Sequence, residues 1–267
     1  MFNLLKTDLK RLLKDKIILI GFIVTCALSI FTVVMYYGLQ SLFDSVEDGG
    51  LFEGMFSGKD SFLKSFSPSS NAGLMIPIFI SVALIKDFRY GTVRNKIIAG
   101  KSRMAIFMSN YFVGTIFGLV FYIASTLISL LLGSILLGYG SPFNLNEFGL
   151  IMTTYGYGLL NYLVFLSCAV FVAIITKSIG LSITITIVGS LLLSIVASVY
   201  DFVERYANKI VMYILAINPV YAAQLIAEDK LYRGSLYNNL IVLIPSICFI
   251  AFFIFWGIML FKKQDIK

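Results

Sequence analysis

Residues 105–138 read AIFMSNYFVGTIFGLVFYIASTLISLLLGSILLG, and this run contains no charged residue. A helix of about 20 apolar residues crosses the hydrocarbon core of a bilayer, so this run is long enough to span a membrane. Similar apolar runs recur along the chain. The six predicted transmembrane helices cover residues 17–38, 70–86, 105–138, 148–176, 179–200 and 240–261. We therefore predict an all-α integral membrane protein whose residues 1–267 form a single transmembrane domain.

The composition supports lipid as the main solvent. Hydrophobic residues make up 59% of the chain and charged residues only 13%, whereas soluble domains carry about 25% charged residues. The sequence has no histidine, which excludes histidine-based catalysis and histidine metal ligation. We see no catalytic pair and no metal-ligand cluster within the apolar runs, so we expect neither an enzyme nor a metal site. Cys26, Cys168 and Cys248 lie inside apolar runs, and we expect them to be buried apolar residues.

The distribution of basic residues predicts the orientation. If the N-terminus is cytoplasmic, 15 of the 21 Lys and Arg residues fall on the cytoplasmic side, as the positive-inside rule requires. The net charge of +7 then reflects topology, and we expect no nucleic-acid partner. An excess of Lys over Arg, with many Ile and Phe, is typical of an AT-rich bacterial genome. We predict a multi-pass protein of the bacterial cell membrane with both termini in the cytoplasm.

Residues 1–16 precede the first predicted span and form an amphipathic pattern. The apolar positions of one helical face are Phe2, Leu5, Leu9, Leu12 and Leu13, whereas Lys6, Lys10, Arg11 and Lys14 avoid that face. Leu4 is the exception. The pattern favours an interfacial helix that rests its apolar face on the membrane and turns its lysines to anionic lipid headgroups. The alternative is a simple basic flank of the first span.

Residues 86–103, KDFRYGTVRNKIIAGKSR, form a predicted cytoplasmic loop with six positive charges and one negative charge. Gly91 is expected to end the preceding helix and Thr92 to cap a short helix over Val93–Ala99. Gly100 suits the left-handed conformation that ends a helix. The pattern favours a capped coupling helix over a solvated basic loop.

One motif in this loop is misleading. Gly100-Lys101-Ser102 resembles the end of a phosphate-binding loop, but that loop needs a glycine at position 95, where this chain has Asn95. It also needs a preceding β-strand and a following soluble helix, whereas a membrane span follows here. We therefore expect no nucleotide site in this chain.

The N-terminal helix, the six spans and the loop sequence Asp-Phe-Arg-Tyr-Gly-Thr-Val-Arg-Asn-Lys, residues 87–96, together resemble the permeases of ABC-2 type transporters. The long predicted external loop, 201–239, is similar to the family's outer region of short helices, and residues 217–221 resemble its Asn-Pro element. The resemblance implies the ABC-2, type V exporter-like architecture, in which residues 1–16 are the elbow helix and 86–103 the coupling loop.

The resemblance also implies partners and a function. A family member works as a homodimer or a paralogous heterodimer with two ABC ATPase subunits, which bind ATP and Mg, so no cofactor is expected in this chain. The function implied is export of an amphipathic or lipophilic cargo, such as a small peptide, bacteriocin, toxin, drug or lipid-like molecule. The residues assigned to ATPase coupling are Asp87, Phe88, Arg89, Tyr90, Gly91, Thr92, Arg94, Asn95, Lys96, Ile97 and Ile98.

The interiors of the predicted spans bear on this function. They carry no charged residue, and ion-driven carriers usually hold one at membrane depth, so the energy source is expected in a partner. Small residues recur at four-residue spacing and predict either a helix-packing seam or a weakly polar wall of a translocation path. These residues are Ser182, Thr186, Ser190 and Ser194 in one span, and Gly114 and Gly118 in another. The alternative function is a non-transporting scaffold or sensor component of a membrane complex.

Overall fold

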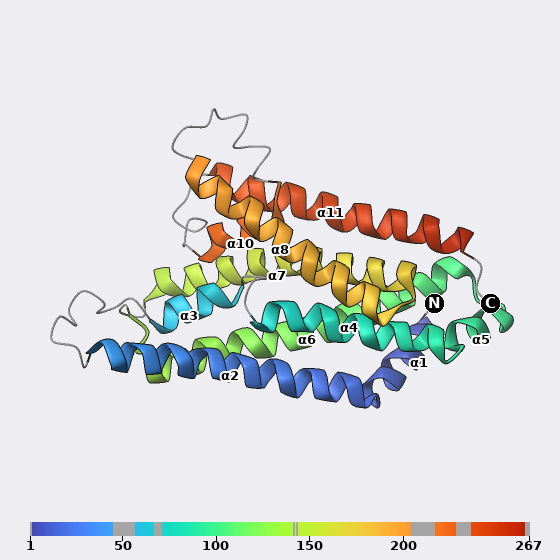
Figure 1. Cartoon of the computed structure of the whole chain (residues 1–267), viewed down its shortest axis with the longest axis horizontal. Coiled ribbons are helices and arrows are strands. Elements are labelled where there is room, and N and C mark those ends of the chain that lie inside the picture. Colours follow the sequence, from blue (N-terminus) through green and yellow to red (C-terminus); the bar gives the residue numbers. More distant parts are fainter. Residues whose placement is uncertain are drawn as a thin grey trace.

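A computed structural model describes residues 2–44, 57–66, 71–140, 142, 144–203, 217–227 and 236–264. These residues form helices and contain no strand (Figure 1). The helices are α1 (Phe2–Leu13), α2 (Lys16–Asp44), α3 (Gly58–Ser65), α4 (Asn71–Arg89), α5 (Thr92–Ile98), α6 (Arg103–Leu136), α7 (Leu145–Thr176), α8 (Ile179–Val203), α10 (Pro219–Ala227) and α11 (Leu236–Lys263).

Five of these helices, α2, α6, α7, α8 and α11, contain segments that are long and apolar enough to cross a membrane. The segments are 16–42, 103–136, 145–176, 179–198 and 242–263, close to five of the six predicted spans. Apolar side chains cover much of their outer surface, for example Leu131 and Ile195, which are 61% and 62% exposed. The chain is therefore an all-α, multi-pass membrane protein.

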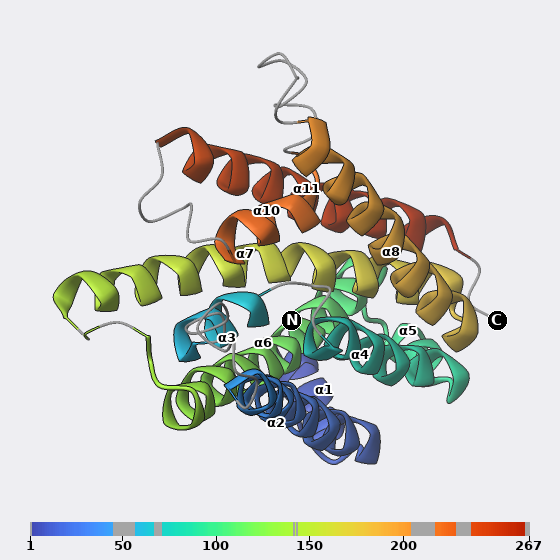
Figure 2. The ribbon, with the colours of Figure 1, turned by 60° about the vertical axis from the view of Figure 1, so that its left-hand side comes forward.

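The remaining predicted span, residues 70–86, corresponds to α4, which is not among these five helices. It has 19 residues, and its last turn carries Lys86, Asp87 and Arg89. The helix contacts α2, α6, α7 and α8, and both views show it between α2 and α8 (Figures 1 and 2). Protein therefore covers α4, and its inner residues Ile76, Ile80 and Leu84 are each 1% exposed.

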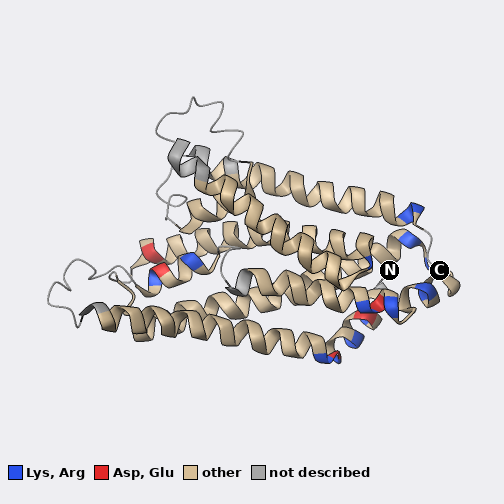
Figure 3. Cartoon of the chain, in the orientation of Figure 1, with Lys and Arg blue, Asp and Glu red and all other residues tan. Residues whose placement is uncertain are grey.

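Charged residues gather at the two ends of the bundle. Most of the described Lys and Arg residues lie at the end that holds both chain ends, α1 and α5 (Figure 3). The opposite end carries a smaller group around α3, and the long middle of the helices is uncharged. Lys59 of α3 pairs there with Glu147 of α7 at 3.2 Å. This separation of apolar and charged zones is what a membrane imposes on its proteins.

Helix α3 lies within residues 39–70, where only a connection between spans was expected. Its first turn forms a capping box, because the Ser57 hydroxyl accepts the Asp60 N–H and the Asp60 carboxylate accepts the Ser57 N–H. Phe62 and Leu63 are 1% and 2% exposed, and the helix packs on α6. Ser57-x-x-Asp60 is a variant of the capping signature that marks helix starts, and this signal could have predicted α3.

Most of the predicted external loop, 201–239, lies outside the described residues, but α10 gives it one short helix, as expected. Pro219 stands at the first helical position, where its missing N–H has no partner to lose. The side-chain oxygen of Asn218 accepts a hydrogen bond from the Val220 N–H at 2.9 Å. The side-chain NH2 group of Asn218 donates to the backbone carbonyl of Leu193 at 2.7 Å. The Asn-Pro element therefore both caps α10 and fixes it to α8.

The expectation that all three cysteines are buried is wrong. Cys26 and Cys168 are half-buried, Cys248 is exposed, and all three are free thiols. Apolar runs in a membrane protein turn many side chains to lipid rather than to protein. An apolar neighbourhood in the sequence therefore does not predict burial by other residues.

We predict that Gly58→Ala lowers stability because α3 approaches α6 too closely for a side chain. A Cβ atom at Gly58 would lie 2.6 Å from the backbone nitrogen and 2.7 Å from the Cα atom of Ser134, and backbone cannot rotate away. Overpacking of this kind costs about 1–3 kcal/mol, which thermal unfolding in detergent would measure. Gly156→Ala is the control, since a Cβ atom at Gly156 would meet no neighbouring atom within 4 Å. Equal stability of the two variants would contradict the close packing of α3.

Candidate functional site

The candidate site is the charged end of the bundle, where the segment 86–103 leaves α4 and enters α6. Gly91 and Gly100 have positive φ angles of 67° and 75°, a backbone conformation that favours glycine. The Gly100 N–H donates to the Ile97 carbonyl at 2.9 Å and the Lys101 N–H to the Lys96 carbonyl at 3.1 Å. This pair of bonds is a Schellman motif. The expected short helix is therefore present, with the expected glycine at each end.

The details of this helix differ from the sequence expectation by one residue. Helix α5 spans Thr92–Ile98 rather than Val93–Ala99, and its N-cap is Gly91 rather than Thr92. The left-handed Gly91 lets the chain reverse directly into the helix, and no side chain caps it. Thr92 is therefore already part of the helix. Threonine is a favoured N-cap residue, and for that reason the sequence placed the helix start one residue too late.

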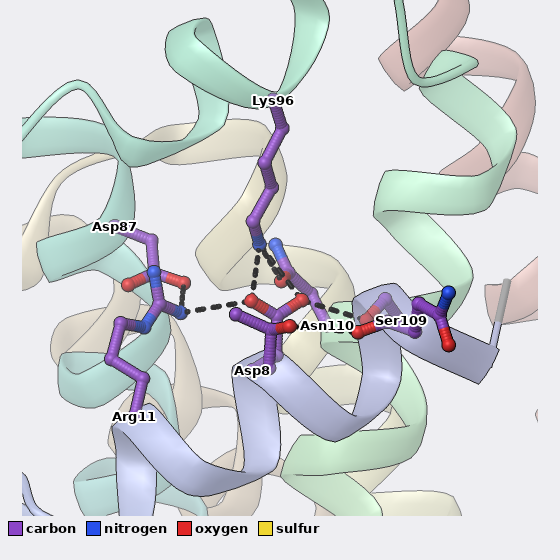
Figure 4. Close-up of polar contacts among 8 residues, drawn as sticks. Asp8, Arg11, Asp87, Lys96, Ser109 and Asn110 are labelled. Carbon is purple, nitrogen blue, oxygen red and sulfur yellow. Dashed lines mark hydrogen bonds and ion pairs between the residues drawn. The ribbon is translucent and has the colours of Figure 1, made fainter. Parts of the chain in front are cut away.

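A buried carboxylate ties α1 to this segment (Figure 4). The side chain of Asp8 is 2% exposed and lies 2.8 Å from the Lys96 ammonium. The Ser109 hydroxyl donates to the same carboxylate at 2.7 Å, and the Arg11 guanidinium lies 3.6 Å away. Lys96 also contacts the Asn110 side-chain oxygen at 3.4 Å. Asp8 therefore links α1, α5 and α6 in one network.

Asp87, at the end of α4, joins the same network through Arg11, which donates a hydrogen bond to its carboxylate. Burial raises the pKa of Asp87, while the charges of Arg11 and Lys96 act in the opposite direction. Arg11 lies between the two carboxylates of Asp8 and Asp87 (Figure 4). Two cations and two carboxylates thus neutralise one another at the junction of four helices.

A second ion pair lies beside the first network. The Lys86 ammonium donates to both carboxylate oxygens of Asp15 at 2.8 Å, joining α4 to the turn between α1 and α2. Although burial opposes it, the hydrogen bonds from Lys86 and from the Ile17 N–H hold the pKa of Asp15 below its usual value. Ion pairs therefore hold this end of the bundle together both along α1, through Asp8 and Arg11, and just after it, through Asp15.

The amphipathic helix α1 is present, but its buried face differs from the predicted one. Leu4, Asp8 and Leu12 are 9%, 2% and 3% exposed and follow one another at four-residue spacing. Leu13, assigned to the apolar face, is 62% exposed. Leu4, the apparent exception to the pattern, is thus on the buried side. The buried stripe packs on α6, where Asp8 contacts Lys96 and Ser109. Of the face that we had expected to rest on lipid, Leu12 is buried, Leu5 and Leu9 are half-buried and Leu13 is exposed, so contact of this face with lipid stays a prediction.

The loop also contacts the far end of the chain. The Phe88 ring lies 6.2 Å from the Phe261 ring of α11, and the Lys177 ammonium stands 5.9 Å from the Phe88 centroid. Arg103, the first residue of α6, donates to the Lys262 carbonyl at 2.8 Å. Phe88 therefore connects α4 to α11 and to the turn between α7 and α8.

The structure separates the predicted coupling residues into inward, half-buried and exposed members. Asp87 and Lys96 face inward and are paired, and Phe88 and Ile97 are packed against the core. These four side chains make contacts within the chain, and their role in ATPase coupling stays a prediction. Gly91 and Thr92 are half-buried. The exposed members are Arg89, Tyr90, Arg94, Asn95 and Ile98.

Sequence reasoning missed Asp8, Arg11, Ser109 and Asn110 as members of this site. Asp8 interrupts the leucine stripe of α1 at the position where a leucine would continue it, and Ser109-Asn110 interrupts the apolar start of α6. A polar residue at a core position of an amphipathic helix needs a partner. These polar residues at core positions could have indicated a buried polar site, but they do not identify which residues pair there.

The glycine pair of α6 lies at helix contacts. A Cβ atom at Gly114 would lie 3.1 Å from Ile80 of α4, and one at Gly118 would lie 2.6 Å from Leu166 of α7. These glycines therefore let α6 approach both neighbours, as the packing interpretation predicts.

In α8, Ser182 and Ser190 are buried, whereas Thr186 and Ser194 are half-buried. The hydroxyls of Thr186, Ser190 and Ser194 donate to backbone carbonyls of their own helix. This helix contacts α4, α7 and α10. The hydroxyl ladder thus lies partly within the bundle, and its alternative role in a translocation path stays a prediction.

Comparison with known protein families assigns the chain to one of them. The model of a family described as "Protein of unknown function (DUF2705)" matches residues 48–267. The chain belongs to this family. No curated protein matches it. The region matched to DUF2705 runs from α3 to α11 and includes Asp87 and Lys96, whereas α1 and α2 precede it. The ion-pair partners Asp8 and Arg11 therefore lie outside the family match.

We predict that Asp8 and Lys96 are energetically coupled. Asp8→Asn or Lys96→Met alone should destabilise the protein, because each leaves a mostly buried charge without its partner. The double variant should lose less than the sum of the two, with a coupling free energy of roughly 1–3 kcal/mol. Thermal unfolding of the four proteins in detergent measures this cycle.

Lys10→Met is the matched control for this cycle, since Lys10 is exposed on the same helix as Asp8. It should change stability by no more than about 0.5 kcal/mol. Additive losses in the double variant would show that the pair contributes no coupling.

Proposed function

We propose that the chain is the transmembrane permease subunit of an ATP-driven exporter of the ABC-2 type. Two such chains, identical or paralogous, would work with two ATPase subunits that bind ATP and Mg. The cargo would be amphipathic or lipophilic, such as a small peptide, a bacteriocin or a lipid-like molecule. The resemblance of residues 87–96 to the coupling loop of that family led to this proposal, and the geometry of the charged end supports it.

The observation that carries the proposal is the construction of the segment 86–103. A mere connector between two membrane helices needs no capped helix, yet α5 is closed by a left-handed glycine at each end. Its inner side is fixed through Val93, which is fully buried, and through Lys96. Tyr90, in the turn before the helix, and Ile98, the last residue of the helix, are each 74% exposed. Large apolar side chains held outward by a rigid support are typical of a docking element.

The same contacts supply a route for movement. A partner that pushes on α5 would act on α4 and α6, which continue directly from the loop, and on α1 through the Asp8 and Arg11 ion pairs. Because α4 contacts four long helices, its displacement would change the packing of the whole bundle. ATP binding in the ATPase subunits would drive this displacement, and the chain itself would catalyse no reaction.

The proposal includes α4 as the sixth span and places the charged end in the cytoplasm. Helices α2, α6, α7 and α8 flank α4, and its 19 residues would cover about 28 Å, close to the thickness of the hydrocarbon core. Under the positive-inside rule, the end rich in Lys and Arg faces the cytoplasm, and both chain ends lie there (Figure 3).

Cysteine labelling tests this orientation. We predict that Ser102→Cys, in a background in which Cys26, Cys168 and Cys248 are replaced, is labelled by an impermeant thiol reagent only after the cells are opened. Leu145→Cys should be labelled in intact cells, because Leu145 is 89% exposed at the opposite end of the bundle. Labelling of Ser102→Cys in intact cells would reverse the topology and remove the coupling role.

We predict that Ile98→Asp abolishes co-purification of an ABC ATPase while membrane insertion and thermal stability stay unchanged. The substitution places an unpaired charge where an apolar contact is expected, and such a change costs a docking interface several kcal/mol. Because Ile98 is already exposed to water, the free chain loses little. Co-purification from the native membrane, followed by transport-coupled ATP hydrolysis, is the measurement.

Leu145→Asp is the matched control, with the same kind of substitution at an exposed apolar residue of the opposite end. It should retain the ATPase in full. If the unaltered chain recovers no ATPase, or if Ile98→Asp retains it with full activity, the chain acts instead as a scaffold or sensor component of a membrane complex.

A further inference from the structure

The charges of the segment 86–103 are not equally available to a partner. Lys86, Asp87 and Lys96 are held in ion pairs with Asp15, Arg11 and Asp8 of the N-terminal region. Arg103 donates to the carbonyl at the end of α11. The single carboxylate of the segment is thus buried and paired, two of its six cations are paired with carboxylates, and Arg103 is held by a backbone carbonyl.

Three cations of the segment stay outside these pairs. Arg89, Arg94 and Lys101 are exposed, and none of them has an ion-pair partner among the described residues. The outward charge of the segment is therefore entirely positive, a property that its sequence, with Asp87 at its start, does not reveal. A surface of one sign attracts a surface of the opposite sign.

The two exposed apolar residues, Tyr90 and Ile98, lie in the same segment as these cations. In α5, Arg94 and Ile98 are four residues apart and therefore lie on the same face of the helix. The opposite face consists of Val93, Lys96 and Ile97, which turn toward the bundle. Exposed side chains and inward side chains are thus separated by helix geometry, and the outward face combines an apolar anchor with a cation.

We infer that the outward surface of Arg89, Tyr90, Arg94, Ile98 and Lys101 docks into an acidic groove with apolar pockets on a soluble cytoplasmic protein. Under the proposed function this protein is the ATPase subunit, and the inference rests on that function for the partner's identity. The apolar anchors supply most of the affinity, whereas the cations steer and orient the encounter.

The position of α5 favours a soluble partner over the bilayer surface. The helix lies at the tip of the long axis, past the end of α4 (Figures 1 and 3). The charged last turn of α4, with Lys86, Asp87 and Arg89, separates it from the apolar part of that helix. Charged residues are costly in hydrocarbon, so we place this turn, and with it Tyr90 and Ile98, on the aqueous side of the charged zone rather than among lipid tails.

The test uses the purified ATPase subunit recovered by co-purification and the full chain in two kinds of nanodisc. One kind contains only phosphatidylcholine, which has no net charge, and the other also contains phosphatidylglycerol, which is anionic. The dissociation constant is measured at roughly 50 and 500 mM NaCl for the unaltered chain and for the double variant Arg89→Glu, Arg94→Glu. We expect the double variant to bind at least about tenfold more weakly at low salt. The difference between the two proteins should shrink at high salt, because salt screens exposed charges.

The matched control is the double variant Lys262→Glu, Lys263→Glu. These lysines are exposed at the same end of the bundle and undergo the same change of charge, but they lie outside the proposed surface. Their replacement should alter binding less than about twofold at either salt concentration.

The outcomes separate this inference from the proposed function. If Ile98→Asp abolishes binding but the Arg89→Glu, Arg94→Glu variant binds normally, the coupling role stands and the acidic groove is wrong. A loss that is equal for the Lys262→Glu, Lys263→Glu control would also overturn the specific surface. If the effect occurs only in nanodiscs with anionic lipid, the cations bind the membrane and not a protein. Recovery of no ATPase overturns the proposed function, and this inference with it.

Discussion

A carboxylate that leaves water must meet cations and hydrogen-bond donors, and the charged end of this protein is organised around that requirement. Asp8, 2% exposed, has Lys96, Ser109 and Arg11 as partners. Because Asp8 and these partners come from α1, α5 and α6, satisfying one side chain fixes the positions of the three helices together. Arg11 then extends the network to Asp87 at the end of α4. Removing one partner would leave the others charged and uncompensated, so the network acts as one unit.

The bilayer imposes the complementary constraint on the rest of the chain. Backbone polar groups find no partners in hydrocarbon, so the spanning segments must be helical, and charges must gather at the ends. Within these limits, close approach is achieved by small residues. Gly114 and Gly118 bring α6 against α4 and α7, and Gly58 brings α3 against α6. The polar network at one end and the glycine contacts elsewhere in the bundle thus serve the same purpose, which is to hold helices together where lipid supplies no hydrophobic driving force between them.

The sequence predicts the long helices well because each one repeats the same signal over many residues. The short helix α5 could also be located, since Gly91 and Gly100 mark both its ends. The pairing of Asp8 with Lys96 could not be predicted, because 88 residues separate the partners and no periodic pattern connects them. For the same reason the outward members of the predicted coupling set could not be told from the inward ones. Composition indicates which residues are charged, but only the folded arrangement decides which charges are already neutralised.

The enclosure of α4 has a consequence for how the protein is made. During synthesis, α4 leaves the ribosome before α6, α7 and α8, which later cover three of its sides. A segment of 19 residues with Pro77 in its interior and three charged residues in its last turn partitions into lipid less favourably than its neighbours do. It must therefore stay close to α2 or to the insertion machinery until the later helices arrive. We therefore expect the bundle to be completed only when the later helices have been made, and we expect truncated chains that end before α7 to leave α4 incompletely covered and open to proteolysis.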